Sequence, residues 1–272
     1  MHRILALLET AGQTEVYMVR GDGRLHHNHL FFAAFIGDYP EQILSTGSVT
    51  GKCPRCNVDH DSLEDYDSQK NQLQDLVSVL DILNTFDQDS ARFLRVCSFT
   101  RIKPIVNPFW KDLLYAHIFC SITPDILHQI YQGIVKHVVS WIIGVVGAAE
   151  VDARCRRLLL NHNLHSFTKG ISSLSHVAGQ EHNQMCRILL ALVMDMQLPQ
   201  GVSTARLLQA VCALMDFTFI AQYPVPTSET LKLLEGALAQ FHKYKSIFVD
   251  LGVRQHFNLP KLHFASHYID LI

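Results

Sequence analysis

The sequence predicts a mainly α-helical protein with a small α/β portion at its N-terminal end, and two patterns carry this prediction. Strand-like patterns occur only in about the first fifty residues, at Glu15–Arg20 and in an apolar run that ends at Asp38. From Leu73 onward, apolar residues recur at intervals of three and four, which is the spacing of one buried helix face. We therefore expect strands only in the first part of the chain and helices in the rest.

Composition places the chain among globular, core-rich proteins. Its 272 residues are 48% hydrophobic and only 18% charged. The formal net charge of −2 gives no overall basic signal, so contact with nucleic acid would have to be local. Seven cysteines, an odd and scattered number, fit a reducing intracellular setting better than a disulfide framework. The start of the chain does not resemble a signal peptide, and the longest uncharged apolar run, Val138–Ala149, is too short to span a bilayer, so we expect a soluble protein.

The opening residues predict a short helix at 3–11 that stops at Gly12, then two strands joined by a turn at 21–23. The second strand is predicted to be buried and to end at Asp38. A carboxylate at the carboxyl end of a strand lies where open α/β sheets carry their chemistry. The alternative is that Asp38 is a turn residue ahead of a segment rich in glycine, proline and serine.

An acidic segment and a series of helices follow. The segment 59–72 is polar and acidic, so it is predicted to be a solvated surface loop. The alternative, a divalent-metal site, is disfavoured because the acids lack the ordered ligand spacing of a calcium loop. Thr123-Pro124-Asp125 is a strong helix start, with a capping hydroxyl, a proline in the first turn and an early acid. The predicted helices are Asp125 to about Ile143, Glu181–Met196, Ser203 to about Ala221, Ser228 to about Tyr244, and a last one starting at Asn258-Leu259-Pro260.

Four residues are candidate zinc ligands. Cys53 and Cys56 have the spacing that lets two thiolates hold one metal ion, and two more ligands would close a tetrahedral site. His263 and His267 lie four residues apart on the predicted last helix, so both imidazoles project from one face. Together they would form a Cys₂His₂ site. The alternative is that the cysteines only form a turn and the histidines only line the edge of a core.

Two further groups are candidates for function. Asp125 and His128 lie one turn apart at a helix start, where they either pair with each other and order the helix or face a ligand. Arg154, Arg156 and Arg157 form the only dense basic cluster, which is either a phosphate contact or a solvated patch. The other cysteines lie among apolar residues and are expected to fill the core.

Several stretches, taken in order, resemble the Plavaka transposases, which are cut-and-paste DNA transposases of mushroom-forming fungi related to the CACTA type. The resemblance covers almost the whole chain, and its motifs are specific in combination. The stretches are Phe35–Gln42, Gly51–Cys56, Ile102–Pro104, Pro108–Leu113, Ser121–Gly133, Glu181–Arg187, Gln222–Pro224 and Leu259–His263.

The resemblance implies an RNase H-like DDE core, in which three acids hold two Mg²⁺ or Mn²⁺ ions for DNA cleavage and strand transfer. The second acid of that family lies just before a Cys-x-x-Cys, which here is Asp38. In the related CACTA and V(D)J-type recombinases, a histidine pair precedes the third acid, and His263 and His267 match it. Residues 1–58 would then be a partial RNase H-like edge of two to three strands, 59–257 a large helical insertion, and 258–272 a terminal helix that returns towards the cysteines. Implied partners are DNA at transposon ends and a second copy of the chain, in the nucleus.

The chain also departs from the family. Its members are several times longer, and the first and third acids are expected outside these residues. The sequence therefore predicts an internal fragment of a transposase that is inactive on its own. The alternative is a non-catalytic helical module that binds protein or DNA, with or without structural zinc.

Overall fold

The computed structural model describes residues 2–66, 72–87 and 89–272, and its chain divides into two compact units. The first unit comprises Met1–His60 and Gln69–Thr123, and the second comprises Asp61–Ser68 and Pro124–Ile272. Helices account for 55% of the structure, beside two small two-stranded sheets, so the predicted mainly α class with a small α/β edge is confirmed. Part of the acidic segment predicted as a surface loop, including Asp67, lies outside the described residues.

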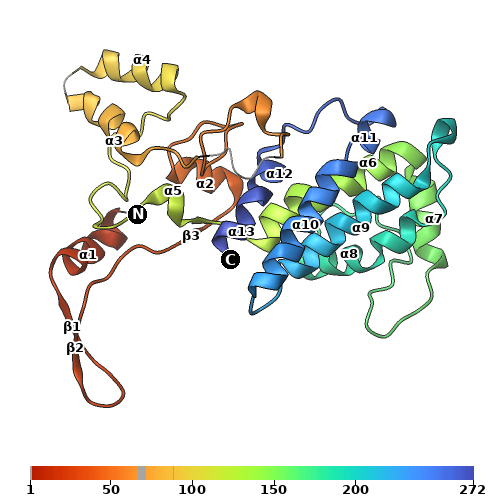
Figure 1. The fold of residues 1–272 in the computed structure, drawn as a ribbon, viewed down its shortest axis with the longest axis horizontal. Helices are drawn as coiled ribbons and strands as arrows, with labels where there is room; N and C mark the ends of the chain where they lie inside the picture. The colour runs from red at the N-terminus through yellow and green to blue at the C-terminus, as the bar shows by residue number, and fades with distance from the viewer. Residues whose placement is uncertain (1, 67–71, 88) are drawn as a thin grey trace. The chain divides into compact units, whose positions relative to one another are not determined.

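The first unit begins with a helix and a hairpin. Helix α1 (His2–Gln13) is followed by strands β1 (Val16–Val19) and β2 (Leu25–Asn28), which pair antiparallel with Val16 opposite Asn28. The predicted first helix, first strand and turn are thereby confirmed. The hairpin projects away from α1 (Figure 1), and three of the four β1 residues are exposed.

The second sheet corrects two predictions. Strand β3 contains only Phe35–Ile36 and pairs in parallel with β4 (Ile122–Thr123), with Phe35 opposite Ile122. The strand before Asp38 is thus much shorter than predicted, and it is not buried, because Ile36 is 66% exposed. The expectation that strands are confined to the first fifty residues is also wrong. Parallel strands are joined by a long crossover, so the partner of β3 lies far away in the sequence. The residues around β3 therefore do not indicate where its partner strand is.

Short helices complete the first unit. They are α2 (Tyr39–Ser45), α3 (Leu76–Asn84), η2 (Thr85–Asp87), α4 (Ser90–Thr100) and α5 (Ile118–Ser121). The predicted helix exists as α3, which Asp75 caps, but it begins at Leu76, and its buried residues are Val79 and Leu83. The predicted buried face is therefore only partly right, because Leu73 and Val77 are exposed. Trp110 is buried in the core of this unit, where its indole N–H donates to the carbonyl of Ser45 over 2.7 Å.

The second unit is a helical bundle. It contains η3 (Ile126–Val135), α6 (Lys136–Val146), α7 (Ala148–Arg157), α8 (Gly179–Val193), η4 (Pro199–Gly201), α9 (Thr204–Ile220), α10 (Ser228–Tyr244), α11 (Ile247–Asp250), α12 (Pro260–Phe264), η5 (Ala265–His267) and α13 (Tyr268–Leu271). The predicted helices at 125–143, 181–196, 203–221 and 228–244 are confirmed as η3 with α6, α8, α9 and α10. Helix α7 was not predicted.

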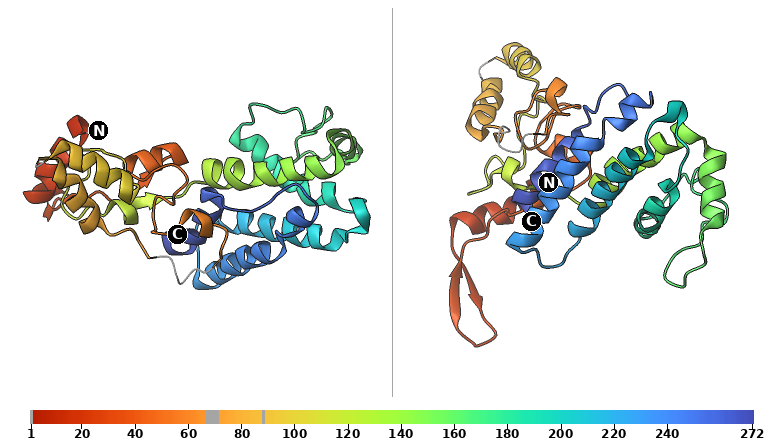
Figure 2. Two further views of the ribbon diagram at one scale, coloured as in Figure 1. Left: turned by 90° about the horizontal axis from the view of Figure 1, so that it is seen from above. Right: turned by 45° about the vertical axis from the view of Figure 1, so that its right-hand side comes forward.

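Helices α8, α9 and α10 run side by side (Figure 1), and the long connection between α7 and α8 forms an open loop (Figure 2). Their inward faces join η3 and α6 in one continuous apolar core, which includes Val138, Trp141, Leu214 and Phe241. No single helix among the described residues is long and apolar enough to cross a membrane; the bent pair Ile126–Val146 and Ala148–Arg157 passes by length and composition only.

The start of the central helix has π-helical geometry, in which the N–H of Lys136 donates to the carbonyl of Tyr131, five residues back. Helix α12 packs closely against this segment at Gly133. A Cβ atom there would lie 2.6 Å from the side chain of Lys261 and 3.0 Å from the carbonyl of His128. The lysine instead uses this space, and its ammonium donates to the carbonyl of His128 over 3.0 Å. A larger residue at position 133 would force Lys261 or α12 to shift.

Candidate functional site

Cys53 and Cys56 lie in a tightly held turn of the first unit. The turn is fixed by the side-chain amide of Gln74, which donates to the carbonyl of Cys53 over 2.9 Å, and by a β-bridge from Cys56 to Leu73. Between the cysteines, the buried guanidinium of Arg55 donates to the carbonyls of Phe119 and Cys120, each over 3.1 Å. These contacts hold the two cysteines in a defined loop rather than in a free turn.

The two thiols have the geometry of a metal-ligand pair. Cys53 is 0% exposed and Cys56 is 2% exposed, no disulfide joins them, and their sulfurs lie within 4.8 Å of each other. Burial, and then hydrogen bonding by Cys56, raises the pKa of the Cys53 thiol well above its usual range, because a thiolate without water or a cation is costly. A zinc ion would supply that cation, since zinc holds cysteine as thiolate.

His263 and His267 form a second pair, in the second unit. They are 2% and 6% exposed, and one ring nitrogen of each lies within 4.8 Å of one in the other. Their ring centroids are 5.4 Å apart and nearly perpendicular. The predicted last helix is broken into α12, η5 and α13, yet the two imidazoles still share a side of the chain. Each pair offers two of the four ligands that a closed tetrahedral zinc site takes.

Asp38 is the N-cap of α2 and follows β3 by two residues. Its Oδ1 accepts from the N–H of Glu41 over 2.9 Å, and the Glu41 carboxylate accepts from the N–H of Asp38 over 3.3 Å. This reciprocal capping box fixes the helix start. Its Oδ2 has no hydrogen-bond partner among the described residues, so one carboxylate oxygen remains open to a ligand.

Asp125 and His128 lie together at the start of the central helix. Oδ1 of Asp125 accepts from the N–H of His128 over 2.7 Å and lies 3.2 Å from its Nδ1. The aspartate is therefore the N-cap of η3, and its backbone carbonyl accepts from the Tyr268 hydroxyl over 2.9 Å. In this geometry, the pair orders the helix start.

The three arginines are not equivalent. Arg154 is held by Glu150 over 2.7 Å and donates to the carbonyls of Leu192, Met194 and Asp195, which end helix α8. Arg157 also contacts Glu150, over 3.3 Å, but its side chain is 65% exposed. Arg154 thus stabilises the unpaired carbonyls of a helix end, and only Arg156 and Arg157 extend into solvent.

A polar network that sequence reasoning missed joins three of the motif stretches. The amide of Asn183 donates to the Tyr131 hydroxyl over 2.8 Å, and that hydroxyl donates to the side-chain carbonyl of Gln222 over 3.1 Å. Arg187 donates to Asn183 over 3.0 Å. The only available signal was that polar residues recur in helices that are otherwise apolar.

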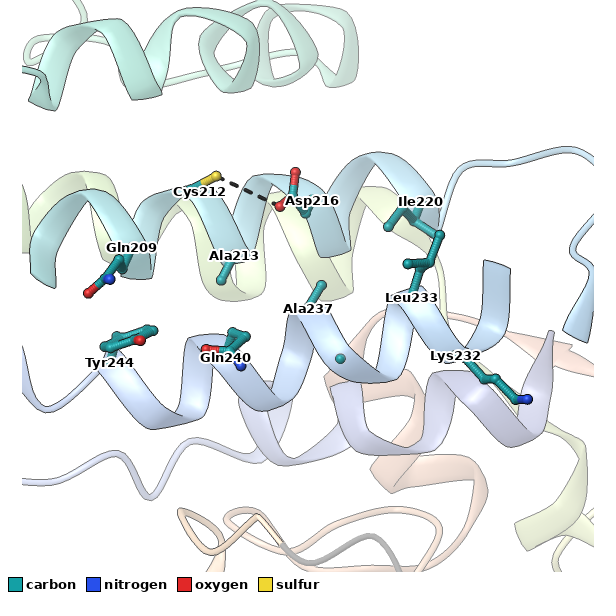
Figure 3. A pocket seen from close by; sticks show the side chains of 11 residues that line it. Gln209, Cys212, Ala213, Asp216, Ile220, Lys232, Leu233, Ala237, Gln240 and Tyr244 are labelled. Atoms are coloured by element: carbon teal, nitrogen blue, oxygen red, sulfur yellow. Dashed lines mark hydrogen bonds between the residues drawn. The ribbon is translucent and has the colours of Figure 1, made fainter. Parts of the chain in front are cut away.

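An open groove of about 620 Å³ lies between α9 and α10 (Figure 3). The groove contains one cysteine, Cys212, whose thiol donates to the carboxylate of Asp216 over 3.7 Å. Burial, and then the negative charge of Asp216, raises the pKa of this thiol. The reactive thiolate is therefore disfavoured, and the groove does not have the chemistry of a cysteine-based active site.

Comparison with known proteins identifies the family. The model of the Plavaka transposase family matches residues 1–142, just over half of the 272-residue chain, and the match includes Asp38 and both cysteines of the loop. No curated protein and no solved structure matches the chain significantly. The matched segment contains five of the stretches on which the resemblance rests, at 35–42, 51–56, 102–104, 108–113 and 121–133. The chain therefore belongs to the Plavaka transposase family.

Proposed function

We propose that this protein derives from a DDE-type DNA transposase, that Asp38 is one of its metal-binding acids, and that the chain on its own does not cleave DNA. The family match supports the transposase origin. DNA at transposon ends is the proposed partner, and a nuclear location and self-association follow from the same proposal. The observation that carries the catalytic part is the position of Asp38, two residues after β3 and with one carboxylate oxygen that makes no hydrogen bond among the described residues.

A single carboxylate is too little for the two-metal reaction. Such a reaction needs two ions held about 4 Å apart by several acids. Mg²⁺ bound by Asp38 alone would take most of its octahedral ligands from water, so it would bind weakly. In neither unit do three or more carboxylates come together among the described residues. The neighbouring acid, Glu41, accepts from the N–H of Asp38 with its Oε2 and would add at most a second carboxylate.

The cysteine pair and the histidine pair are the two halves of one structural zinc site in this proposal. Each pair is buried and has its two ligand atoms within 4.8 Å of each other. A tetrahedral zinc ion requires about 3.8 Å between two sulfurs and about 3.3 Å between two nitrogens, so both pairs are within reach of this geometry. Two thiolates and two imidazoles also form a donor set that zinc prefers. The site would link residues more than 200 positions apart in the sequence.

A plasmid assay tests the catalytic proposal. The purified chain is incubated with supercoiled plasmid and Mg²⁺ or Mn²⁺, and nicked and linear products are separated on a gel. We expect no cleavage above a buffer control. Cleavage that disappears in Asp38→Ala but persists in Asp81→Ala, an exposed acid of α3, would overturn the proposal, because it would show a complete active site in these residues.

A second candidate function is a non-catalytic helical module that binds protein or DNA. The observation in its favour is the continuous apolar core of the second unit, which is built from its own helices. A gel shift with random duplex DNA distinguishes the two kinds of partner. Binding that falls steeply with salt favours retained DNA contact, whereas no binding at low salt favours a protein partner.

A further inference from the structure

Three side chains of metal-ligand type lie together on the β1–β2 hairpin of the first unit. Extending the antiparallel ladder by one residue beyond Val16 places Glu15 opposite His29. Because successive side chains alternate between the two faces of a strand, His27 lies on the same face as His29. These three side chains therefore share one face of the hairpin, and His26 lies on the other face.

The carboxylate of Glu15 lies between the two imidazoles. Its Oε2 lies 2.5 Å from Nδ1 of His27, and its Oε1 lies 4.0 Å from Nε2 of His29. Each carboxylate oxygen thus faces a nitrogen of a different ring. Two imidazoles and one carboxylate form a donor set that zinc and similar divalent transition metals take.

A contact with the end of α1 fixes how His29 presents its ring. Its Nδ1 lies 3.2 Å from the carbonyl of Gly12, and because a carbonyl only accepts, Nδ1 carries the proton of the neutral ring. The free lone pair is then on Nε2, the nitrogen that faces Glu15. Metal-bound histidines have this same arrangement, with one nitrogen on the ion and the other donating to a carbonyl or carboxylate. The approach is close, since a Cβ at Gly12 would lie 2.9 Å from the carbonyl of Leu30.

The hairpin has little apolar packing of its own. Tyr17, Val19 and Leu25 are each more than half exposed, and the hairpin projects away from α1 (Figure 1). An isolated two-stranded hairpin is only marginally stable in water. A metal ion bound by Glu15 on one side and His27 on the other would link the two strands and stabilise their pairing.

We propose that Glu15, His27 and His29 bind one divalent transition-metal ion of the zinc class, and that this ion links the strands of the hairpin. The three side chains are about half exposed, so the ion enters from solvent and water completes its coordination. The ion replaces the hydrogen bond between Glu15 and His27, and rotation of the exposed side chains brings the three donors onto it. An exposed site with three protein ligands releases its ion on dilution. This site is separate from Asp38 and from the proposed Cys₂His₂ site.

Calorimetric titration of the purified protein with Zn²⁺ tests the site. We expect one zinc ion per chain to bind, beyond any zinc already present, with a Kd of about 1–100 µM. His29→Ala and Glu15→Gln should each weaken this binding at least about tenfold, because each removes one of the three protein ligands. His26→Ala is the matched control, since it removes a neighbouring histidine from the other face, and its Kd should stay within about threefold. Cys53→Ser should also keep this binding, which separates the hairpin site from the proposed Cys₂His₂ site.

Trypsin cleavage at the turn measures whether the ion links the strands. Arg20 and Arg24 flank the turn and are exposed. Zn²⁺ at about ten times its Kd should slow cleavage there at least about threefold in the unchanged protein but not in Glu15→Gln, because cleavage follows the population of opened hairpin.

Three outcomes would contradict the proposal. Absence of additional zinc binding up to about 1 mM, or equal binding by His29→Ala and the unchanged protein, would overturn the site. An equal loss of affinity in His26→Ala would also overturn it, because it would show dispersed binding by the histidines of the hairpin. Zinc binding without slower cleavage would overturn the link between the strands.

Discussion

The side-chain amide of Gln129 donates a hydrogen bond to the backbone carbonyl of Lys261 over 2.8 Å, across 132 positions of sequence. Lys261 in turn donates its ammonium to the carbonyl of His128, over 3.0 Å. These bonds attach α12 to the π-helical segment η3, and α12 carries His263. The position of one proposed zinc ligand is therefore set by the start of the central helix.

Replacing Gly133 by alanine should weaken this attachment. The new Cβ would lie 2.6 Å from the side chain of Lys261, so α12 must move or its lysine must leave the His128 carbonyl. We expect a loss of about 1–3 kcal/mol in the free energy of unfolding, measured by urea denaturation. Gly236→Ala is the matched control, because a Cβ there meets nothing within 4 Å, and alanine in α10 should stabilise by up to about 1 kcal/mol. Equal stability of Gly133→Ala and the unchanged protein would show that the contact contributes little.

Purified protein should contain one zinc ion per chain, measured by mass spectrometry of the metal. Cys53→Ser and His263→Ala should each lower the bound zinc severalfold, because a tetrahedral site that loses one ligand binds more weakly. A chelator should lower the melting temperature of the unchanged protein but not of these variants, since zinc that binds only the folded state stabilises it.

Cys97→Ser controls for the loss of a buried thiol, because Cys97 is 1% exposed and lies outside both pairs. Its zinc content should stay at one ion per chain. Loss of zinc in the cysteine variant but full retention in His263→Ala would contradict a shared site and leave the cysteines with other ligands.

Lys245 should make stability depend on pH in the alkaline range. Burial lowers its pKa from 10.5 to about 8, although Glu64 and Asp65 oppose the change. Below pH 8 the lysine is charged in both the folded and unfolded states, and the full cost of burying its charge is present. Between pH 8 and 10.5 the folded state releases the proton while the unfolded state keeps it, so stability rises with pH. Relative to Lys245→Met, the unchanged protein should gain about 3 kcal/mol over this interval.

The measurement is urea denaturation of both proteins at several pH values. Lys243→Met, which removes an exposed lysine from the last turn of α10, controls for the loss of one charge. The ammonium of Lys245 also donates to the carbonyl of Glu64 over 2.7 Å and contacts Nδ1 of His242 over 2.9 Å. Loss of these bonds lowers the stability of Lys245→Met at every pH. The test is therefore how the difference in free energy of unfolding between the two proteins changes with pH. A constant difference between the two proteins would contradict it.

The arginines of α7 should separate into structural and DNA-contacting residues. Arg154→Gln should lower the free energy of unfolding by about 1–3 kcal/mol, because the carbonyls at the end of α8 lose a charged donor. Arg156→Gln should leave stability unchanged and, if this face contacts phosphates, reduce the salt dependence of DNA binding by about one unit of slope. If the salt dependence of DNA binding is unchanged in both Arg156→Gln and Arg157→Gln, these arginines do not contact phosphates and form only a solvated surface.

Local signals predicted much of the helical unit. A helix start close to Asp125 was predicted correctly, but with Thr123 as its cap and Pro124 in its first turn. The structure instead makes Asp125 the N-cap of η3 and places Thr123 in β4. Helix α10 begins at Ser228 and ends at Tyr244, as its periodicity predicted. These predictions were right because helix starts and buried helix faces depend on residues only a few positions apart in the sequence. The spacing of the cysteines and of the histidines likewise predicted pairs whose ligand atoms lie close together.

Features that depend on distant residues were not predictable. Strand β4 exists because Ile122 pairs with Phe35, and nothing near residue 122 signals a strand. The π geometry of η3 accompanies the close approach of Lys261 to Gly133, which involves residues more than 100 positions apart. Strand β3 is shorter than predicted for the same reason, since an apolar run becomes a strand only where a partner strand is available to pair with it. The predicted division into an RNase H-like edge and an insertion concerns descent from a longer enzyme, and it stays a prediction.

The attachment of α12 to η3 also sets an order of events during synthesis. Gln129 leaves the ribosome 132 residues before Lys261, and at 5–20 residues per second this delay is about 7–26 seconds. During that time, the nascent helix can form its local hydrogen bonds. The side-chain amide of Gln129 must hydrogen-bond to water instead of Lys261, and the lysine does not yet occupy the space beside Gly133. Translation speed and chaperone access in that interval would therefore affect the yield of folded protein more than they affect its final stability.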